Sequence, residues 1–194
     1  MHLDGYCNID PALPRVDFIS RMTRQLVEAF QDDVVEAVLV PAIGAIPMAQ
    51  WAPYWYRELT GREIPGVWAD KVKPRGFVIE RNGFAAGIAG KRVLILEDMI
   101  NQMYSVKELD KIVRQLGGKT VGVGALIANR GVTAAKIGVP KFVGLCEFAY
   151  EAWDETNCEL CKSKVPIVVD PALGHGEEFR QAHPNYAGGF VTIG

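Results

Sequence analysis

The sequence predicts an α/β fold in which a mostly parallel central sheet is flanked by helices. Short and nearly continuous apolar runs recur along the chain, as expected for strands that are buried on both faces. Amphipathic stretches, with apolar residues three and four positions apart, separate these runs and predict helices. Strands and helices that alternate in this way are typical of an α/β fold with a mostly parallel sheet.

Length and composition predict a single domain over residues 1–194. The chain has 194 residues, 49% hydrophobic and 23% charged, and a formal net charge of -2, so it can bury a substantial core and has no basic footprint for nucleic acid. No apolar run approaches the roughly 20 residues needed to span a bilayer, and the first residues lack the features of a signal peptide. We therefore expect a cytoplasmic location, with neither nucleic acid nor membrane as a partner.

The first part of the chain predicts two strand and helix units after a short opening loop that two prolines interrupt. A β-branched run marks the first strand, small residues follow it, and a glycine ends the next helix. In order, we expect a helix over 17–30, a strand over 34–40, a helix over 47–59 and a strand over 64–69.

The second part continues the alternation after a basic loop at 70–76. Two adjacent glycines end a helix there, and an Asn-Gly pair marks a turn. The region after Glu147 is rich in turns and too irregular to be a second domain. The expected elements are strands over 77–79 and 93–96, a helix over 105–116, and strands over 121–128 and 142–146.

The most informative segment runs from Val93 to Ser105. Four apolar residues end at two adjacent carboxylates, Glu97 and Asp98, and Ser105 then opens a helical pattern. In an open α/β sheet, ligands bind at the carboxyl ends of the strands, so we expect a site here. The alternatives are an exposed strand end for the two acids and a simple capping box for Ser105 with Glu108.

Two other loops can join that site. Residues 41–46 form a turn of small residues, and the basic loop at 70–76 contains Lys71, Lys73 and Arg75. Backbone amides bind phosphate, cations neutralise it, and carboxylates hold a metal or a sugar diol. The three loops together predict a site for a polyanion bound with Mg²⁺, although a solvated charge cluster also explains the three cations.

Spacing excludes two familiar nucleotide motifs. The segment Gly118-Lys119-Thr120 resembles the end of a P-loop, but Val113 stands where the earlier glycine is required. The pair Gly122 and Gly124 lacks the third glycine of a dinucleotide motif. Neither an ATP site nor a nicotinamide site is therefore predicted.

Four cysteines, without a secretory signal, are expected to be free thiols. Cys158 and Cys161 form a C-x-x-C motif, but the sequence contains no second pair near it. A zinc site would need Cys146, Cys7 or a distant histidine to complete it. Packing in a loop is the simpler interpretation, so we assign no metal ligand and no redox role.

The segment Val93–Ser105 resembles the phosphoribosyl pyrophosphate motif of the type I phosphoribosyltransferase family. The rest of the chain is most similar to the orotate phosphoribosyltransferase group, in a divergent bacterial branch. The matching segments are an early base-site segment at Tyr6-Cys7-Asn8-Ile9-Asp10, a pyrophosphate loop at Pro41–Pro47, a mobile catalytic loop with Lys71, Lys73, Arg75 and Gly76, an Asn129-Arg130 pair, and a tail from Ala152 to Pro166 and at Gly174-His175-Gly176.

This resemblance implies the type I phosphoribosyltransferase fold with a small hood from the terminal segments. It also implies Mg²⁺-dependent transfer of a phosphoribosyl group from phosphoribosyl pyrophosphate to a pyrimidine base, expected to be orotate, in a homodimer with shared active sites. Mg²⁺ would be held mainly by the phosphoribosyl pyrophosphate. The implied residues are Lys73, Asp98 and Glu97 for catalysis; Gly44, Ala45, Lys71, Arg75, Asn101, Gln102, Met103, Tyr104 and Ser105 for phosphoribosyl pyrophosphate; and Tyr6, Asn8 and Arg130 for the base.

The chain departs from the family pattern in the phosphate loop. Where the family usually has Thr-Thr-Gly-Gly-Ser, residues 101–105 read Asn-Gln-Met-Tyr-Ser. Glycines in such a loop let backbone amides approach a phosphate and take conformations that other residues resist. Ala45 also replaces a common glycine. These differences suggest an alternative function, that of a catalytically impaired homologue that binds a nucleotide or another anionic metabolite as a regulator.

Overall fold

The computed structural model describes residues 2–73, 75–170, 174 and 176–193. These residues form two compact units: a larger one from Ile9 to Phe148, and a smaller one that combines Met1–Asn8 with Ala149–Gly194. The terminal segments thus gather in a unit of their own, as expected for the hood. That both units make up a single domain over 1–194 stays a prediction.

The larger unit is built on a six-stranded sheet with the strand order β4-β3-β2-β5-β6-β7. All neighbouring strands run parallel except β3 and β4, which confirms the predicted mostly parallel sheet. The strands are β2 (Ala37–Pro41), β3 (Gly66–Lys71), β4 (Phe77–Val78), β5 (Arg92–Ile100), β6 (Lys119–Asn129) and β7 (Phe142–Phe148).

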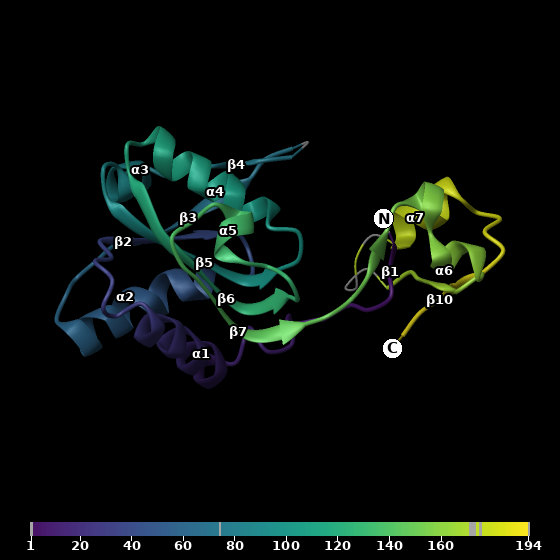
Figure 1. Cartoon of the computed structure of the whole chain (residues 1–194), viewed down its shortest axis with the longest axis horizontal. Coiled ribbons are helices and arrows are strands. Elements are labelled where there is room, and N and C mark those ends of the chain that lie inside the picture. The colour runs from purple at the N-terminus through teal and green to yellow at the C-terminus, as the bar shows by residue number, and fades with distance from the viewer. Residues whose placement is uncertain (1, 74, 171–173, 175, 194) are drawn as a thin grey trace. The chain divides into compact units, whose positions relative to one another are not determined.

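Helices cover both faces of this sheet (Figure 1). On one face, α1 (Val16–Ala29) and α2 (Ile46–Thr60) pack against each other and against the strands. The other face is covered by α3 (Phe84–Ile88) and α4 (Tyr104–Gln115), with α5 (Ala134–Ile137) after β6. Because successive side chains of a strand point to opposite faces, each central strand contributes to both cores.

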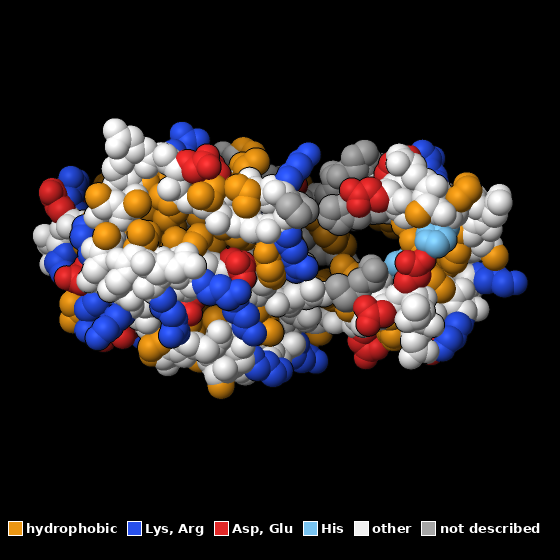
Figure 2. All heavy atoms as spheres, turned by 90° about the horizontal axis from the view of Figure 1, so that it is seen from above, with side chains coloured by type: hydrophobic (Ala, Val, Ile, Leu, Met, Phe, Trp, Pro, Cys, Tyr) orange, Lys and Arg blue, Asp and Glu red, His pale blue; other side chains and the backbone are white. Residues whose placement is uncertain are grey.

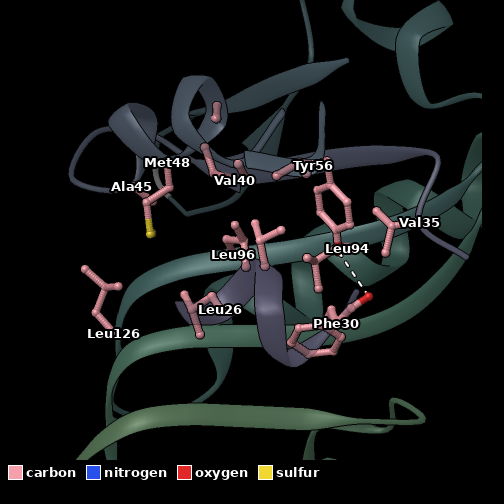
Figure 3. Close-up of a cluster of buried hydrophobic side chains, with 14 of the residues drawn as sticks. Leu26, Phe30, Val35, Val40, Ala45, Met48, Tyr56, Leu94, Leu96 and Leu126 are labelled. Carbon is pink, nitrogen blue, oxygen red and sulfur yellow. Dashed lines mark hydrogen bonds between the residues drawn. The ribbon is translucent and has the colours of Figure 1, made fainter. Parts of the chain in front are cut away.

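The core under α1 and α2 shows this alternation (Figure 3). Val38, Val40, Leu94 and Leu96 belong to this cluster, whereas Leu39 and Ile95 belong to the cluster under α4. The Tyr56 hydroxyl donates a hydrogen bond of 3.4 Å to the backbone carbonyl of Phe30. This bond satisfies a polar group that the core would otherwise leave unpaired.

The observed elements differ from the predicted ones mainly at their ends. Strand β5 continues through Ile100, so Glu97 and Asp98 lie within the strand and not in a turn after it. The prediction that Ser105 opens the next helix was wrong by one residue, because α4 begins at Tyr104. Helices α3 and α5 were not predicted, since segments of five and four residues are too short to show a helical period.

The smaller unit consists of short elements. Strand β1 (His2–Leu3) pairs antiparallel with β8 (Ala152–Trp153), and β9 (Ile167–Val168) pairs parallel with β10 (Phe190–Val191). Three short helices complete it: the 3₁₀ helix η1 (Glu155–Asn157), α6 (Glu159–Lys162) and α7 (Gly176–Ala182). The irregular character predicted for the tail is therefore confirmed; His175 lies outside the described residues.

The helices and the charged surface of the described residues bear on a possible membrane span and on the balance of charge. None of their helices combines the length and the apolar character needed to cross a membrane. On the face drawn in Figure 2, lysine and arginine side chains are interspersed with aspartate and glutamate, in keeping with a net charge of -2.

Candidate active site

The predicted site residues of the larger unit gather at one edge of the sheet. Strands β2, β3, β5 and β6 run parallel, so their carboxyl ends meet at this edge. The segments there are the small-residue loop after β2, the basic loop after β3, the acidic pair near the end of β5, and Arg130 after β6. Ligands of open α/β sheets bind at such an edge.

Glu97 and Asp98 have different surroundings although they are adjacent. The Glu97 side chain is buried, with 6% of its surface exposed. This burial raises the pKa of Glu97 well above its usual value of 4.5, and the charge of Asp98 and a hydrogen bond with its carboxyl raise the pKa further, while Lys71 lowers it. Asp98 is half-buried and accepts a 2.9 Å hydrogen bond from the Met99 amide. Asp98 is therefore the more accessible of the two carboxyl groups.

The small-residue loop lies directly against Asp98. A Cβ atom built on Gly44 would overlap the Asp98 carboxylate, and its next contact would be the Leu13 side chain at 3.4 Å. Only glycine fits this close approach of backbone to carboxylate. The loop also contains a cis peptide bond between Ala42 and Ile43.

Ala45, which follows Gly44, has an ordinary helical conformation, with φ -82° and ψ -8°, at the start of α2. Its side chain is buried in the core beside Met48 (Figure 3). An alanine fits this position without strain, so the conformation explains why the chain does not need a glycine here.

The phosphate loop at 101–103 leads into α4. Met103 has a left-handed conformation, with φ 59°, and its side chain makes no capping bond to the helix. Ser105 lies inside the first turn of α4, so the capping box proposed for Ser105 and Glu108 is wrong; Glu108 instead pairs with Lys111 at 2.5 Å. The first amides of a helix lack partners within the helix and attract anions, which makes this turn suitable for a phosphate.

The basic loop is the tip of a hairpin between β3 and β4. The Val72 amide donates a 3.1 Å hydrogen bond to the Gly76 carbonyl, and Lys71, Lys73 and Arg75 are exposed. Pro74 lies outside the described residues. The Arg75 guanidinium carbon stands 3.8 Å from the centroid of the Tyr104 ring, so the hairpin tip contacts the first residue of α4.

The remaining predicted residues concern the base. The Arg130 amide donates a 2.8 Å hydrogen bond to the backbone carbonyl of Phe148. The Arg130 side chain is exposed at the carboxyl edge of the sheet. Tyr6 and Asn8 belong to the smaller unit. Their contact with a base therefore stays a prediction.

Two features of this edge could not be predicted from the residues alone. The overlap of a Gly44 Cβ with Asp98 depends on a contact between the loop after β2 and strand β5, and no local pattern reports it. The left-handed conformation of Met103 is equally hidden, because methionine gives no signal for positive φ. A glycine in the corresponding position of the family pattern was the only available indication.

Comparisons with known proteins agree with this architecture. No protein-family model matches the chain. Among solved structures, orotate phosphoribosyltransferase of Mycobacterium tuberculosis H37Rv in complex with phosphoribosyl pyrophosphate superimposes with a TM-score of 0.55 at 22% identity, covering 73% of this chain and 80% of that one. Adenine phosphoribosyltransferase from Thermoanaerobacter pseudethanolicus gives a TM-score of 0.52 at 15% identity, covering 72% and 86%. The fold is that of the type I phosphoribosyltransferases.

Sequence relatives narrow this class. The chain is 30% identical over 169 residues to an orotate phosphoribosyltransferase of Caldanaerobacter subterraneus subsp. tengcongensis, covering 86% of this chain and 82% of the relative. It is 28% identical over 167 residues to the orotate phosphoribosyltransferase of Desulforamulus reducens, with the same coverage. The chain therefore belongs to the orotate phosphoribosyltransferase family.

Proposed function

We propose that this chain transfers a phosphoribosyl group from phosphoribosyl pyrophosphate to orotate, releasing pyrophosphate and the nucleotide. Membership of the family supports the reaction. The observation that carries the proposal for this site is the close approach of Gly44 to Asp98, because it joins the small-residue loop and the acidic pair into one surface. The hairpin tip with Lys71, Lys73 and Arg75 follows a neighbouring strand at the same edge.

The chemistry is a substitution at the anomeric carbon of the ribose. Such a reaction needs no protein nucleophile; it needs the reactants to be held in position and the departing pyrophosphate to be stabilised. Lys73, with Lys71 and Arg75, would neutralise the leaving group. Asp98 and Glu97 would accept hydrogen bonds from the ribose hydroxyls.

The 5′-phosphate would bind at the beginning of α4. The residues in position are Asn101, Gln102 and Met103 of the loop before α4 and Tyr104 and Ser105 of its first turn, and the first-turn amides of this twelve-residue helix supply the donors. Gly44 and Ala45 would present backbone to the pyrophosphate at the start of α2.

Mg²⁺ fits the groups that line this edge. Mg²⁺ prefers oxygen ligands and is usually bound through one or two carboxylates together with substrate phosphates. Asp98 provides a half-buried carboxylate, and most of the remaining ligands would come from phosphoribosyl pyrophosphate. The ion would supply positive charge that stabilises the pyrophosphate as it leaves.

Base recognition and assembly complete the proposal. Arg130 would pair with the orotate carboxylate, as bidentate contacts between guanidinium and carboxylate allow, and Tyr6 and Asn8 would contact the base.

We also propose a homodimer with shared active sites, and the expected cytoplasmic location stays a prediction. The alternative function, an impaired homologue acting as a regulator, is not favoured by relatives that are orotate phosphoribosyltransferases over 86% of this chain.

The decisive experiment is an assay of pyrophosphate release with phosphoribosyl pyrophosphate, Mg²⁺ and a panel of bases. Turnover with orotate, abolished when a chelator removes Mg²⁺, would support the proposal. Calorimetry that detects no binding of phosphoribosyl pyrophosphate with Mg²⁺ at millimolar concentration would overturn it.

A pair of lysine variants tests the role of the hairpin. Lys73→Ala should lower kcat much more than it weakens binding, because the lysine acts on the leaving group. Lys119→Ala is the matched control, since Lys119 is exposed at the first position of β6, at the opposite edge of the sheet. Equal effects of both substitutions would contradict the assigned role of Lys73.

A further inference from the structure

Three potential metal ligands meet in the smaller unit, within the set of described residues. The Nδ1 atom of His2 lies 3.3 Å from the Cys158 sulfur and 3.0 Å from the Cys161 sulfur. All three ligand atoms lie within 4.8 Å of one another. From the sequence, a zinc site at the C-x-x-C motif would need Cys146, Cys7 or a distant histidine, and loop packing is the simpler interpretation. The structure places His2 there, 156 residues away from Cys158.

Secondary structure holds these three side chains in place. Pairing of β1 with β8 sets His2 opposite Trp153. Cys158 immediately precedes α6, and its sulfur accepts a 3.4 Å hydrogen bond from the Cys161 amide, so both thiols belong to one helical turn. Cys158 is 2% exposed and His2 is 9% exposed. Cys161 is only half-buried, so the cluster is buried on one side and reaches solvent on the other.

We infer that His2, Cys158 and Cys161 form a zinc site. Two thiolates and one imidazole nitrogen are ligands that Zn²⁺ prefers, and a C-x-x-C turn is a common source of two of them. This inference is independent of the transferase activity proposed for the larger unit.

The distances are close to those that bound zinc requires. With Zn–S bonds of about 2.3 Å and Zn–N bonds of about 2.0 Å at tetrahedral angles, sulfur and nitrogen ligands stand about 3.6 Å apart. The observed separations of 3.3 and 3.0 Å need to widen by about 0.3 and 0.6 Å, respectively. Small side-chain rotations supply a change of this size.

The fourth coordination position would be filled by water from a neighbouring cavity. Cys161 lines an open cavity of about 470 Å³ together with Phe179 and Tyr186. Glu155 and His183 line the same cavity, and the Nε2 atom of His183 lies 2.5 Å from a carboxylate oxygen of Glu155. In Figure 2, histidine side chains of this unit lie beside acidic and hydrophobic ones. The carboxylate of Glu155 would add negative charge near the bound cation.

The composition of the smaller unit explains what the metal would do. Cys158 and Val169 are the buried hydrophobic residues among those described in this unit, so its apolar core is minimal. Small units of this kind usually need a metal or disulfides for stability. Zinc bound to His2 and to the C-x-x-C turn would link strand β1 to α6 within the unit, and its binding free energy would contribute to folding.

Metal content of the full chain tests this inference. The protein should carry a tag without histidine at its C-terminus, because His2 lies next to the N-terminus. After incubation with Zn²⁺ under reducing conditions and gel filtration, elemental analysis should find about one zinc per chain. Cobalt in place of zinc should give the absorption of a tetrahedral Co²⁺ thiolate complex.

Variants identify the ligands. Cys158→Ser and Cys161→Ser should each lower the bound zinc at least tenfold, as should His2→Leu, whereas His2→Cys should retain it because three cysteines also bind zinc. Cys146→Ser is the matched control, since Cys146 is exposed on β7 of the larger unit, and should leave the zinc content unchanged. Glu155→Gln should weaken binding without abolishing it.

Three results would overturn the inference. One is a wild-type chain that retains no zinc and gives no cobalt thiolate absorption. Another is full zinc content in both Cys158→Ser and Cys161→Ser. The third is a disulfide between Cys158 and Cys161 in protein purified without reductant from cells, seen as a mass two hydrogens lower, with no metal bound. The retained binding in His2→Cys separates loss of a ligand from failure to fold.

Discussion

The guanidinium group of Arg75 stacks on the ring of Tyr104, with 3.8 Å between the guanidinium carbon and the ring centroid. This contact joins the hairpin tip to the first residue of α4, where the family pattern usually has a glycine. A glycine could not make the contact. Tyr104, which replaces a glycine of the family pattern next to the phosphate loop, thus also provides the ring that Arg75 of the basic loop contacts.

Removing this ring should loosen the hairpin tip. A cation–π contact at an exposed site is worth about 0.5–1 kcal/mol, or a two- to fivefold change in an opening equilibrium. In Tyr104→Leu, hydrogen exchange at the Val72 amide, which bonds to Gly76, should accelerate by about this factor. Tyr104→Phe keeps a ring and should exchange nearly as the wild type does. If Leu and Phe variants exchange at equal rates, the ring does not hold the hairpin.

The contact between Gly44 and Asp98 predicts a second outcome. Because a Cβ at Gly44 would overlap the Asp98 carboxylate, Gly44→Ala must displace the loop or the acid. Displacement of a positioning group by about 1 Å can cost roughly 100-fold in rate, so kcat/KM for phosphoribosyl pyrophosphate should fall strongly.

Gly87→Ala is the control for this substitution. A Cβ at Gly87 in α3 would lie 3.4 Å from Val67, an ordinary contact, and alanine favours helix over glycine by about 1 kcal/mol. This variant should keep wild-type kinetics and unfold at an equal or higher urea concentration. Wild-type kinetics in Gly44→Ala would show that Asp98 does not act at this loop.

The sheet could be predicted from the sequence because its signal is local. The run from Val93 to Leu96 is apolar on both faces, and the structure places it in the centre of the sheet, between β2 and β6. The position of Glu97 and Asp98 at the carboxyl edge followed from the same run. Only their inclusion in the strand was missed, since acidic residues disfavour strand prediction.

Contacts between distant segments could not be predicted in this way. His2 meets the C-x-x-C turn only after β1 pairs with β8, and a two-residue strand has too few positions to show a period. The stacking of Arg75 on Tyr104 likewise joins the hairpin tip to the start of α4, two segments whose sequence patterns are independent. Such contacts arise from tertiary structure, so the sequence supplied the residues but not their partners.

The left-handed conformation of Met103 predicts a third outcome. Non-glycine residues pay roughly 1–2 kcal/mol in this region, and the Met103 side chain also packs against the core under α4. Met103→Gly loses the packing but removes the steric cost, whereas Met103→Ala loses the packing and keeps the cost.

Urea denaturation of the two variants separates these effects. The Gly variant should be more stable than the Ala variant by about 1 kcal/mol in the free energy of unfolding. Its KM for phosphoribosyl pyrophosphate should also fall, because glycine lets the amides of the loop approach the phosphate. An Ala variant as stable as the Gly variant would show that the conformation carries no cost.

Burial of Glu97 predicts how stability depends on pH. Burial and the charge of Asp98 raise the pKa of Glu97 in the folded chain, so the folded state binds this proton more tightly than the unfolded state does. Stability from this group is therefore complete below the unfolded pKa and is lost as the pH rises through the folded pKa.

The neutral isostere Glu97→Gln should not show this loss of stability. In urea denaturation between pH 4 and pH 8, its free energy of unfolding should increase relative to wild type as the pH rises, while Glu63→Gln, at an exposed position, should follow the wild-type curve. A constant difference between Glu97→Gln and wild type over this range would show that Glu97 has the same pKa in both states.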